Sequence, residues 1–359
     1  MSFIKGENKM KHNKRISIVV VLLMIGIMIV GTVAAESLLP SPRGYVSMAY
    51  DNQSKQIVLF GGQTGPWPLR TSINGETWAY NVKNNTWAQM FPKKKPNDKA
   101  AASLAYDTKS DRVIMFGGGN TGLLGFMTSE TWAYNYNANT WKKMAYGPMD
   151  YLGARLVYDS NSDRMILFGG LNVLDWYLQD GTWVYDDDTN TWTEMNPAVS
   201  PPGRNYQAMT YDSKTDRVLT WGGMYIDESP LPESMWAYDY NTDTWVEFPA
   251  VGTYPHSRDY AAMVYDSESD RTILFGGVPI AYPEEGVGTW AYDYNTHTWE
   301  QMNPDPEPPF VSRHAMVYSE ATDRVILFGG ETDDGVLFTY TNAIWAYDFN
   351  TNTWTDLTP

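Results

Sequence analysis

Cysteine is absent from this 359-residue chain, and histidine occurs only four times. Without cysteine, no disulfide, thiol nucleophile or thiolate metal site can form. His256 and His314 are the histidines that could approach one another, and two imidazoles without a third ligand are a weak signal for a metal. We therefore expect neither a metal ion nor a cofactor.

Basic residues are also scarce, with 26 Lys and Arg against 42 Asp and Glu, and the net charge is −16. An acidic chain of this kind repels nucleic acid and anionic membrane surfaces, so neither is expected as a partner. Hydrophobic residues make up 43% of the sequence and aromatic residues 14%. This composition is sufficient for a packed core and excludes general disorder.

The longest uncharged run lies near the N-terminus. Residues 1–15 carry five Lys or Arg, residues 16–35 carry no charge, and the run ends with Val33-Ala34-Ala35. This order is typical of a secretory signal, but 20 such residues can also span a bilayer. We expect residues 1–35 to form one N-terminal hydrophobic helix, either a signal peptide or a membrane anchor, followed by a linker at residues 36–42. The rest of the chain is then extracytoplasmic, secreted or anchored.

Tryptophan is abundant, and most of it follows a fixed pattern. Two tryptophans nine positions apart, with a tyrosine two positions after the first, recur six times. The pairs are Trp78 and Trp87, Trp132 and Trp141, Trp183 and Trp192, Trp236 and Trp245, Trp290 and Trp299, and Trp345 and Trp354. A period of about 50 residues predicts a repeat architecture.

Each repeat reads as four short strands, which we call A to D. In the fifth repeat these are residues 260–265, residues 271–275, residues 289–292 and a strand carrying Trp299 and Met302. They are rich in Val, Ile, Tyr, Trp and Thr and are separated by Asp, Asn, Ser and Thr, which favour tight turns. A double glycine ends every strand B, where it permits positive φ.

Four-stranded sheets of this kind bury their faces when they stack radially. We predict an all-β, six-bladed β-propeller of four-stranded antiparallel blades. The twelve paired tryptophans are expected between the blades. The approximate blade limits are residues 43–92, 99–146, 151–197, 204–249, 258–304 and 311–359.

These motifs resemble the kelch family, whose repeats carry an apolar strand ending in Gly-Gly, then a Tyr, then a Trp at a fixed step. Here the motif reads FGG…TWAYDYNTHTW over residues 275–299. The resemblance covers residues 43–359 and implies propeller blades. Every blade is complete in sequence order, so we expect closure by packing between blades, without a shared blade. Galactose oxidase is a kelch-like copper enzyme whose cofactor needs a Cys–Tyr cross-link, which this chain cannot make.

Some connections between strands keep the same length in all six repeats, and others do not. The A–B and C–D turns keep their lengths, whereas the B–C loops and D–A linkers do not. In an up-and-down sheet these variable connections emerge on one face, and variable loops often carry function. We expect the ligand-binding face there, with exposed aromatic residues typical of binding hot spots. The candidates are Trp67, Trp176, Tyr177, Tyr225, Tyr282 and Tyr340. The alternative is that they pack back as lids over the channel.

Basic residues precede or begin strand A in each repeat. They are Arg43, Lys99, Arg155, Arg204, Arg258 and Arg313. In an unbroken strand their odd spacing from the strand-A Met or Leu directs them to one side, and we name Arg43, Arg204, Arg258 and Arg313 as a possible anion site. Pairing with acidic residues and backbone carbonyls is the structural alternative. The kelch resemblance adds that similar domains bind acidic peptides with arginines at the channel mouth.

The sequence therefore favours an extracytoplasmic binding module for a protein, peptide or glycan. One alternative is a carbohydrate-active enzyme, mutarotase-like or epimerase-like. That enzyme would need an acid–base pair such as Asp180 or Glu284 with a nearby Arg or His. A third is a structural cell-envelope protein. The D-x-N-x-D match at residues 239–243 lacks the later calcium ligands and reads as a turn.

Overall fold

The computed structural model describes residues 39–65, 72–119, 127–148, 151–224, 233–279, 288–333 and 338–359. The secondary structure of these ranges consists of β-strands, so the all-β prediction is confirmed. The predicted N-terminal helix, residues 1–35, lies outside them. In the described part of the chain, no helix is long and apolar enough to cross a membrane.

The main strands form antiparallel four-stranded sheets, six of them in the described residues, numbered here 1 to 6 in chain order. Sheet 1 contains β1 (Ser47–Asp51), β2 (Gln56–Phe60), β5 (Thr77–Asn81) and β6 (Thr86–Met90). Sheet 2 contains β7 (Ala100–Asp107), β8 (Arg112–Gly119), β9 (Glu130–Asn135) and β10 (Thr140–Tyr146). Sheet 3 contains β12 (Arg155–Asp159), β13 (Arg164–Phe168), β16 (Thr182–Asp186) and β17 (Thr191–Met195).

The second half repeats this order of strands. Sheet 4 contains β18 (Ala208–Asp212), β19 (Arg217–Trp221), β20 (Ser234–Asp239) and β21 (Thr244–Pro249). Sheet 5 contains β23 (Ala262–Asp266), β24 (Arg271–Phe275), β26 (Thr289–Asp293) and β27 (Thr298–Gln301). Sheet 6 contains β28 (Ala315–Ser319), β29 (Arg324–Phe328), β32 (Ile344–Asp348) and β33 (Thr353–Asp356). Among the described strands, no four-stranded sheet takes a strand from a distant repeat, as expected for closure without a shared blade.

Short strands lie in the connections. They are β3 (Gln63–Thr64), β4 (Ser72–Ile73), β11 (Tyr151–Leu152), β14 (Leu171–Asn172), β15 (Tyr177–Leu178), β22 (Arg258–Asp259), β25 (Val278–Pro279), β30 (Glu331–Asp333) and β31 (Phe338–Tyr340). β11 belongs to a D–A linker and pairs with β14 of a B–C loop, and β22 pairs with β25 in the same way. In these two repeats, the D–A linker and the B–C loop therefore lie side by side.

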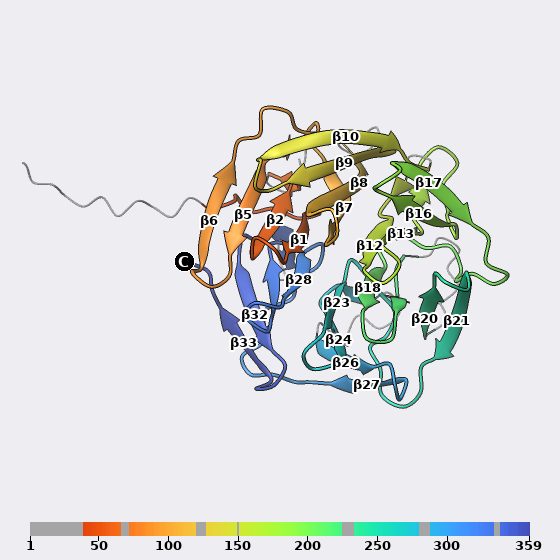
Figure 1. Ribbon diagram of the computed structural model, residues 1–359. Coiled ribbons are helices and arrows are strands. Elements are labelled where there is room, and N and C mark those ends of the chain that lie inside the picture. The colour runs from red at the N-terminus through yellow and green to blue at the C-terminus, as the bar shows by residue number, and fades with distance from the viewer. Residues whose placement is uncertain are drawn as a thin grey trace, which may run out of the picture. The chain divides into compact units, whose positions relative to one another are not determined.

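The sheets are arranged around a common centre, with strand A innermost and strand D outermost (Figure 1). The inner strands contact one another in the order β1, β7, β12, β18, β23 and β28, and β28 contacts β1. This cyclic order is the arrangement that a β-propeller requires.

Aromatic residues fill the layers between sheets. The second tryptophan of each repeat packs on the aromatic residue that ends strand B of the preceding sheet, with ring centroids 4.9–5.2 Å apart. The pairs are Trp141 with Phe60, Trp192 with Phe116, Trp245 with Phe168, Trp299 with Trp221, Trp354 with Phe275, and Trp87 with Phe328. The last pair joins the first sheet to the last.

Strand A begins later than the sequence predicts. In the fifth repeat it starts at Ala262, whereas strand B, at Arg271–Phe275, lies where it was expected. Tyr260 has φ of 56°, and its left-handed conformation interrupts the extended chain. The assumption of an unbroken strand from Arg258 into strand A is therefore wrong.

Candidate functional site

A ring of left-handed residues closes the end of the channel near the variable loops. The six residues three positions before the strand-A Met or Leu have φ between 53° and 73°: Tyr45, Ala101, Gly153, Tyr206, Tyr260 and Arg313. In five of the six, the backbone N–H donates to the carbonyl oxygen of the equivalent residue in the preceding repeat, at 2.9–3.1 Å. One of these bonds, from Tyr45 to Arg313, joins sheet 1 to sheet 6.

Side chains of this ring form a plug at the channel mouth. The rings of Tyr45, Tyr206 and Tyr260 contact one another with centroids 4.3–5.9 Å apart. The Arg313 guanidinium lies 4.0 Å from the centroid of Tyr260, and its Nε donates to Tyr45 Oη at 2.7 Å. Its Nη1 also pairs with Glu331 Oε2 at 2.8 Å. Arg313 therefore lies at the mouth of the channel, where its charge is balanced by Glu331.

The other three predicted arginines lie two positions earlier and are buried. Arg43, Arg204 and Arg258 each have 0% exposure. Their Nη1 groups donate to the carbonyls of Gly61, Gly222 and Gly276, the first glycines of the Gly-Gly turns. They thus hold the end of strand B to the D–A linker. This geometry supports the structural alternative and not a cationic collar.

Among the described loop residues, three strongly exposed apolar side chains gather in the B–C loop of sheet 3. β14 and β15 form a small hairpin there, and Leu174, Trp176 and Tyr177 are 84%, 65% and 62% exposed. Trp176 has φ of 57°, a strained conformation for a bulky residue. Asn172 Oδ1 accepts from the N–H of Leu174, which fixes the tip. The tip is therefore preorganised with its apolar side chains in solvent.

The remaining predicted aromatics divide into two groups. Tyr340 Oη donates to Gln63 Oε1 at 3.0 Å and its ring packs on Gly44, so it links the B–C loop of sheet 6 to the region of sheet 1. Trp67, Tyr225 and Tyr282 lie outside the described residues. Leu174, two residues before Trp176, is at least as exposed as the aromatic residues of this loop but is not aromatic, so the search for exposed aromatics does not find it.

Two buried titratable groups lie near the plug. Burial raises the pKa of Asp259 to about 6, although the charge of Arg313 opposes this shift, and its Oδ1 has no hydrogen-bond partner. Burial, and then the charge of Arg155, lowers the pKa of His314 to about 3. Neither ring nitrogen of His314 has a hydrogen-bond partner. His256 pairs instead with Glu233, so the two predicted histidines have different surroundings.

The two candidate acids of the enzyme alternative are Asp180 and Glu284. Asp180 is exposed on its loop, and Glu284 lies outside the described residues. No group of three His, Cys, Asp or Glu side chains suited to a metal ion occurs in the described ranges. Near the plug, Asp259 is a carboxyl group whose pKa is raised by burial, as in many general acids and bases, but the charge of Arg313 opposes this shift.

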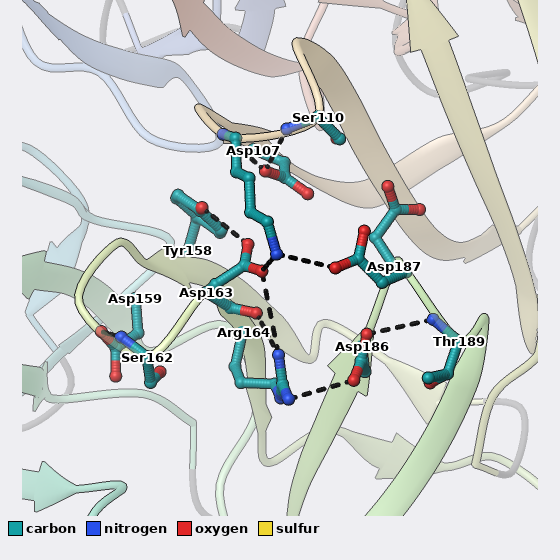
Figure 2. Close-up of polar contacts among 12 residues, drawn as sticks. Asp107, Ser110, Tyr158, Asp159, Ser162, Asp163, Arg164, Asp186, Asp187 and Thr189 are labelled. Carbon is teal, nitrogen blue, oxygen red and sulfur yellow. Dashed lines mark hydrogen bonds and ion pairs between the residues drawn. The ribbon is translucent and has the colours of Figure 1, made fainter.

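At the opposite end, the A–B and C–D turns form a polar face (Figure 2). Asp159 Oδ1 accepts from the N–H of Ser162, and Tyr158 Oη donates to Asp163 Oδ1 at 3.0 Å. Arg164 Nη2 pairs with Asp186 Oδ2 at 3.0 Å, which ties the A–B turn to the C–D turn. Close variants of this arrangement recur around the ring and explain why these turns keep one length.

Two cavities lie along the channel. One of about 100 Å³ is bounded by Arg155, His314 and the beginnings of the inner strands, and one of about 300 Å³ extends to the A–B turns. Both are lined by the same ring of Met48, Leu104, Leu156, Met209, Met263 and Met316. This Met/Leu ring therefore separates the two cavities.

Comparison with known proteins agrees with this geometry. The family model described as the KLHDC2/KLHL20/DRC7 Kelch-repeats domain matches residues 6–215 and again residues 153–359. Among curated proteins, the chain is 24% identical to the flagellar outer-arm dynein alpha chain of Chlamydomonas reinhardtii, over 70% of this chain and 6% of that protein.

Two animal proteins show the same level of similarity. The chain is 24% identical to multiple epidermal growth factor-like domains protein 8 of Mus musculus, over 67% of this chain and 9% of that protein. It is also 24% identical to the host cell factor homolog hcf-1 of Caenorhabditis elegans, over 66% of this chain and 32% of that protein. The chain thus spans a third or less of each relative. The repeats, the sheets and the family match together show that the chain belongs to the kelch-repeat family.

Proposed function

We propose that residues 43–359 form a six-bladed β-propeller that binds a protein or peptide outside the cytoplasm through its B–C and D–A loops. The cyclic contacts of the inner strands and the six tryptophan contacts between sheets support this blade count. The sequence of residues 1–35 supports the extracytoplasmic location. Kelch repeats are interaction modules, and this family membership supports a protein partner.

The observation that carries the proposal is the exposed tip formed by Leu174, Trp176 and Tyr177. Aromatic and apolar side chains that protrude on a fixed turn lose little conformational entropy on binding, so they are suited to act as hot spots. The buried arginines cannot reach a ligand, and Arg313 is paired. The apolar tip therefore favours an apolar docking pocket on the partner over an anionic ligand. A glycan that stacks on Trp176 is the competing occupant.

A peptide array and a glycan array probed with residues 37–359 would test the proposal. This range is one compact unit. We expect peptide ligands, and we expect Trp176→Ala to weaken them by about 30-fold, the effect of losing a hot spot. Val246→Ser, at an exposed position on the outer strand β21, is the matched control and should leave binding unchanged.

Both variants should melt at the wild-type temperature, because both side chains are in solvent. Peptide binding that persists in both Trp176→Ala and Leu174→Ser would show that the docking face lies elsewhere. Ligands found only on the glycan array would replace the protein partner with a carbohydrate.

A further inference from the structure

The smaller channel cavity contains a charged side chain that the function proposed above does not use. The cavity has a volume of about 100 Å³ and lies on the loop side of the Met/Leu ring. Its lining consists of the residues that begin strand A and those directly before them. A cavity needs only about 15 Å³ to hold one water molecule, so this one has room for a small ion.

Arg155 departs from the repeat pattern at this level of the channel. The residues that directly precede the Met/Leu ring all line the cavity, and they are Ser47, Ser103, Arg155, Ala208, Ala262 and Ala315. Five small side chains leave space around the axis, and the sixth position brings a guanidinium to it. The lining therefore contains one cationic side chain among small and apolar ones.

Among the described residues, Arg155 has no acidic partner. Its Nε donates to the carbonyl of Gln207 at 2.8 Å, which is its one hydrogen bond with them. Arg313 differs, because it pairs with Glu331 at 2.8 Å. Burial lowers the pKa of Arg155, and the groups that oppose this shift are two tyrosines, not a carboxylate. A buried charge without a counter-ion is costly, so an anion beside Arg155 would stabilise the fold.

Neutral hydrogen-bond donors also line the cavity. Ser103 Oγ accepts from the N–H of Leu156 at 2.9 Å, and its own proton is not donated to a described group. His314 is 6% exposed, and neither of its ring nitrogens has a hydrogen-bond partner. Burial, and then the charge of Arg155, lowers the pKa of His314 and keeps the ring neutral, so one nitrogen is a donor.

The acidic groups of the protein lie outside this cavity. None of its described lining residues is acidic. Near the plug, Glu331 pairs with Arg313, whose charge also acts on Asp259. The acidic A–B turns lie beyond the Met/Leu ring, where the five arginines that begin strand B pair with aspartates of strand C or of the turn after it. These pairs leave the charge of Arg155 without a counter-ion.

We propose that this cavity binds a small monovalent anion, with Arg155 as its charged partner and the neutral donors of the lining around it. Hydrogen bonds from a charged donor to an anion are stronger than neutral ones, above all where water is excluded. A halide and a small carboxylate such as formate share this chemistry.

The anion reaches the cavity past the Met/Leu ring, because the tyrosine plug and the ring of left-handed residues close the other end. Four of the six ring residues are methionines, whose unbranched side chains adapt readily. Binding therefore needs no opening of the contacts between sheets.

The chloride dependence of equilibrium unfolding tests the site. Urea unfolding of residues 37–359, one compact unit, is measured as sodium gluconate replaces sodium chloride at constant ionic strength. Chloride fits the cavity, whereas gluconate has six carbons and does not. We expect the urea midpoint to rise with chloride, since a ligand that binds only the folded state stabilises it.

Arg155→Met removes the charge and keeps a side chain of similar length. Its apparent affinity for chloride should fall by at least about tenfold, as for the loss of a hydrogen bond to a charged group. Arg271→Met is the matched control, because Arg271 pairs with Asp293 and does not line the cavity. This control should keep the chloride dependence of the wild type.

The same series with sodium formate separates the two kinds of anion. A larger rise with chloride identifies a halide, and a larger rise with formate identifies a carboxylate. Either result supports the site if Arg155→Met reduces it. A chloride and formate dependence that is equal in wild type and Arg155→Met overturns the proposal.

Crystals of the wild type grown in sodium bromide locate the ion even if Arg155→Met does not fold. Anomalous scattering should give a bromide peak in the cavity beside the Arg155 guanidinium. Absence of this peak, with no stabilisation by formate, overturns the proposal. Trp176→Ala should not alter the chloride dependence, so the anion site and the loop tip can fail independently.

Discussion

At the residue scale, equivalent positions of the repeats share a backbone conformation but differ in side chain. The left-handed ring holds Tyr at three positions, and Ala, Gly and Arg at the others. Buried polar atoms without a hydrogen-bond partner include Asn205 Oδ1, Asp259 Oδ1 and both ring nitrogens of His314. These residues precede strand A of sheets 4, 5 and 6. The channel mouth is therefore one place where the repeats differ in their buried polar groups.

Asp259→Asn should stabilise the protein at alkaline pH. The carboxyl of Asp259 has a pKa of about 6 in the folded state, above its unfolded value of about 3.9. The folded state therefore binds the proton more tightly, and its stability falls as pH rises from about 4 to 6. The substitution removes this loss, so the variant should gain about 2–3 kcal/mol at pH 8 and little at pH 3.5.

Urea unfolding of both proteins across this pH range measures the difference. Asp180→Asn, at an exposed position, serves as the control and should show no such trend. A difference between Asp259→Asn and wild type that does not change with pH would show that Asp259 is not the group responsible.

At the element scale, a tryptophan and a threonine join neighbouring sheets at four of the six contacts. Trp245 Nε1 of β21 donates to Thr182 Oγ1 of β16 at 2.9 Å, and three other repeats have the same bond. In sheet 4 the threonine position is occupied by Met235, and Trp299 Nε1 is buried without an acceptor. The aromatic contact is thus common to all repeats, whereas the hydrogen bond is not.

Thr182→Val should destabilise the fold although it preserves side-chain volume. It leaves the Trp245 N–H buried without a partner, which costs about 1–3 kcal/mol. Thr193→Val, at an exposed position of the neighbouring strand β17, is the control and should cost little. Chemical denaturation measures both. Equal effects of the two substitutions would mean that the indole N–H finds another acceptor.

The elements were largely predictable because their pattern repeats. The six tryptophan pairs and the Gly-Gly turns locate the strands to within one or two residues, as β24 shows at Arg271–Phe275. The arrangement before strand A was not predictable, because Tyr45, Tyr206 and Tyr260 adopt a conformation that sequence patterns assign to glycine. For that reason the sequence predicts one common side for Arg313 and Arg258, whereas the structure has Arg258 buried and Arg313 at the channel mouth.

At the scale of the whole ring, the two ends of the channel differ. The loop end is closed by aromatic side chains and carries an exposed apolar tip, whereas the turn end is open, polar and acidic. Loops that vary in length tolerate different side chains. The turns are held by contacts between sheets, such as the ion pair of Lys109 with Asp163. The proposed protein partner therefore acts at the loop end of the channel.

Closure of the ring gives the first and last sheets the same aromatic contact as the other neighbours, although Ile344 occupies the threonine position there. Trp87 packs on Phe328 at 5.0 Å, and Trp192 packs on Phe116 at the same distance. Both tryptophans are partly buried, so Trp87→Ala and Trp192→Ala should each lower the free energy of unfolding by about 3–5 kcal/mol. In an open array, the sheets at the two ends would not be in contact, and Trp87→Ala would cost far less than Trp192→Ala. Denaturant unfolding of the two variants decides between a closed ring and an open array.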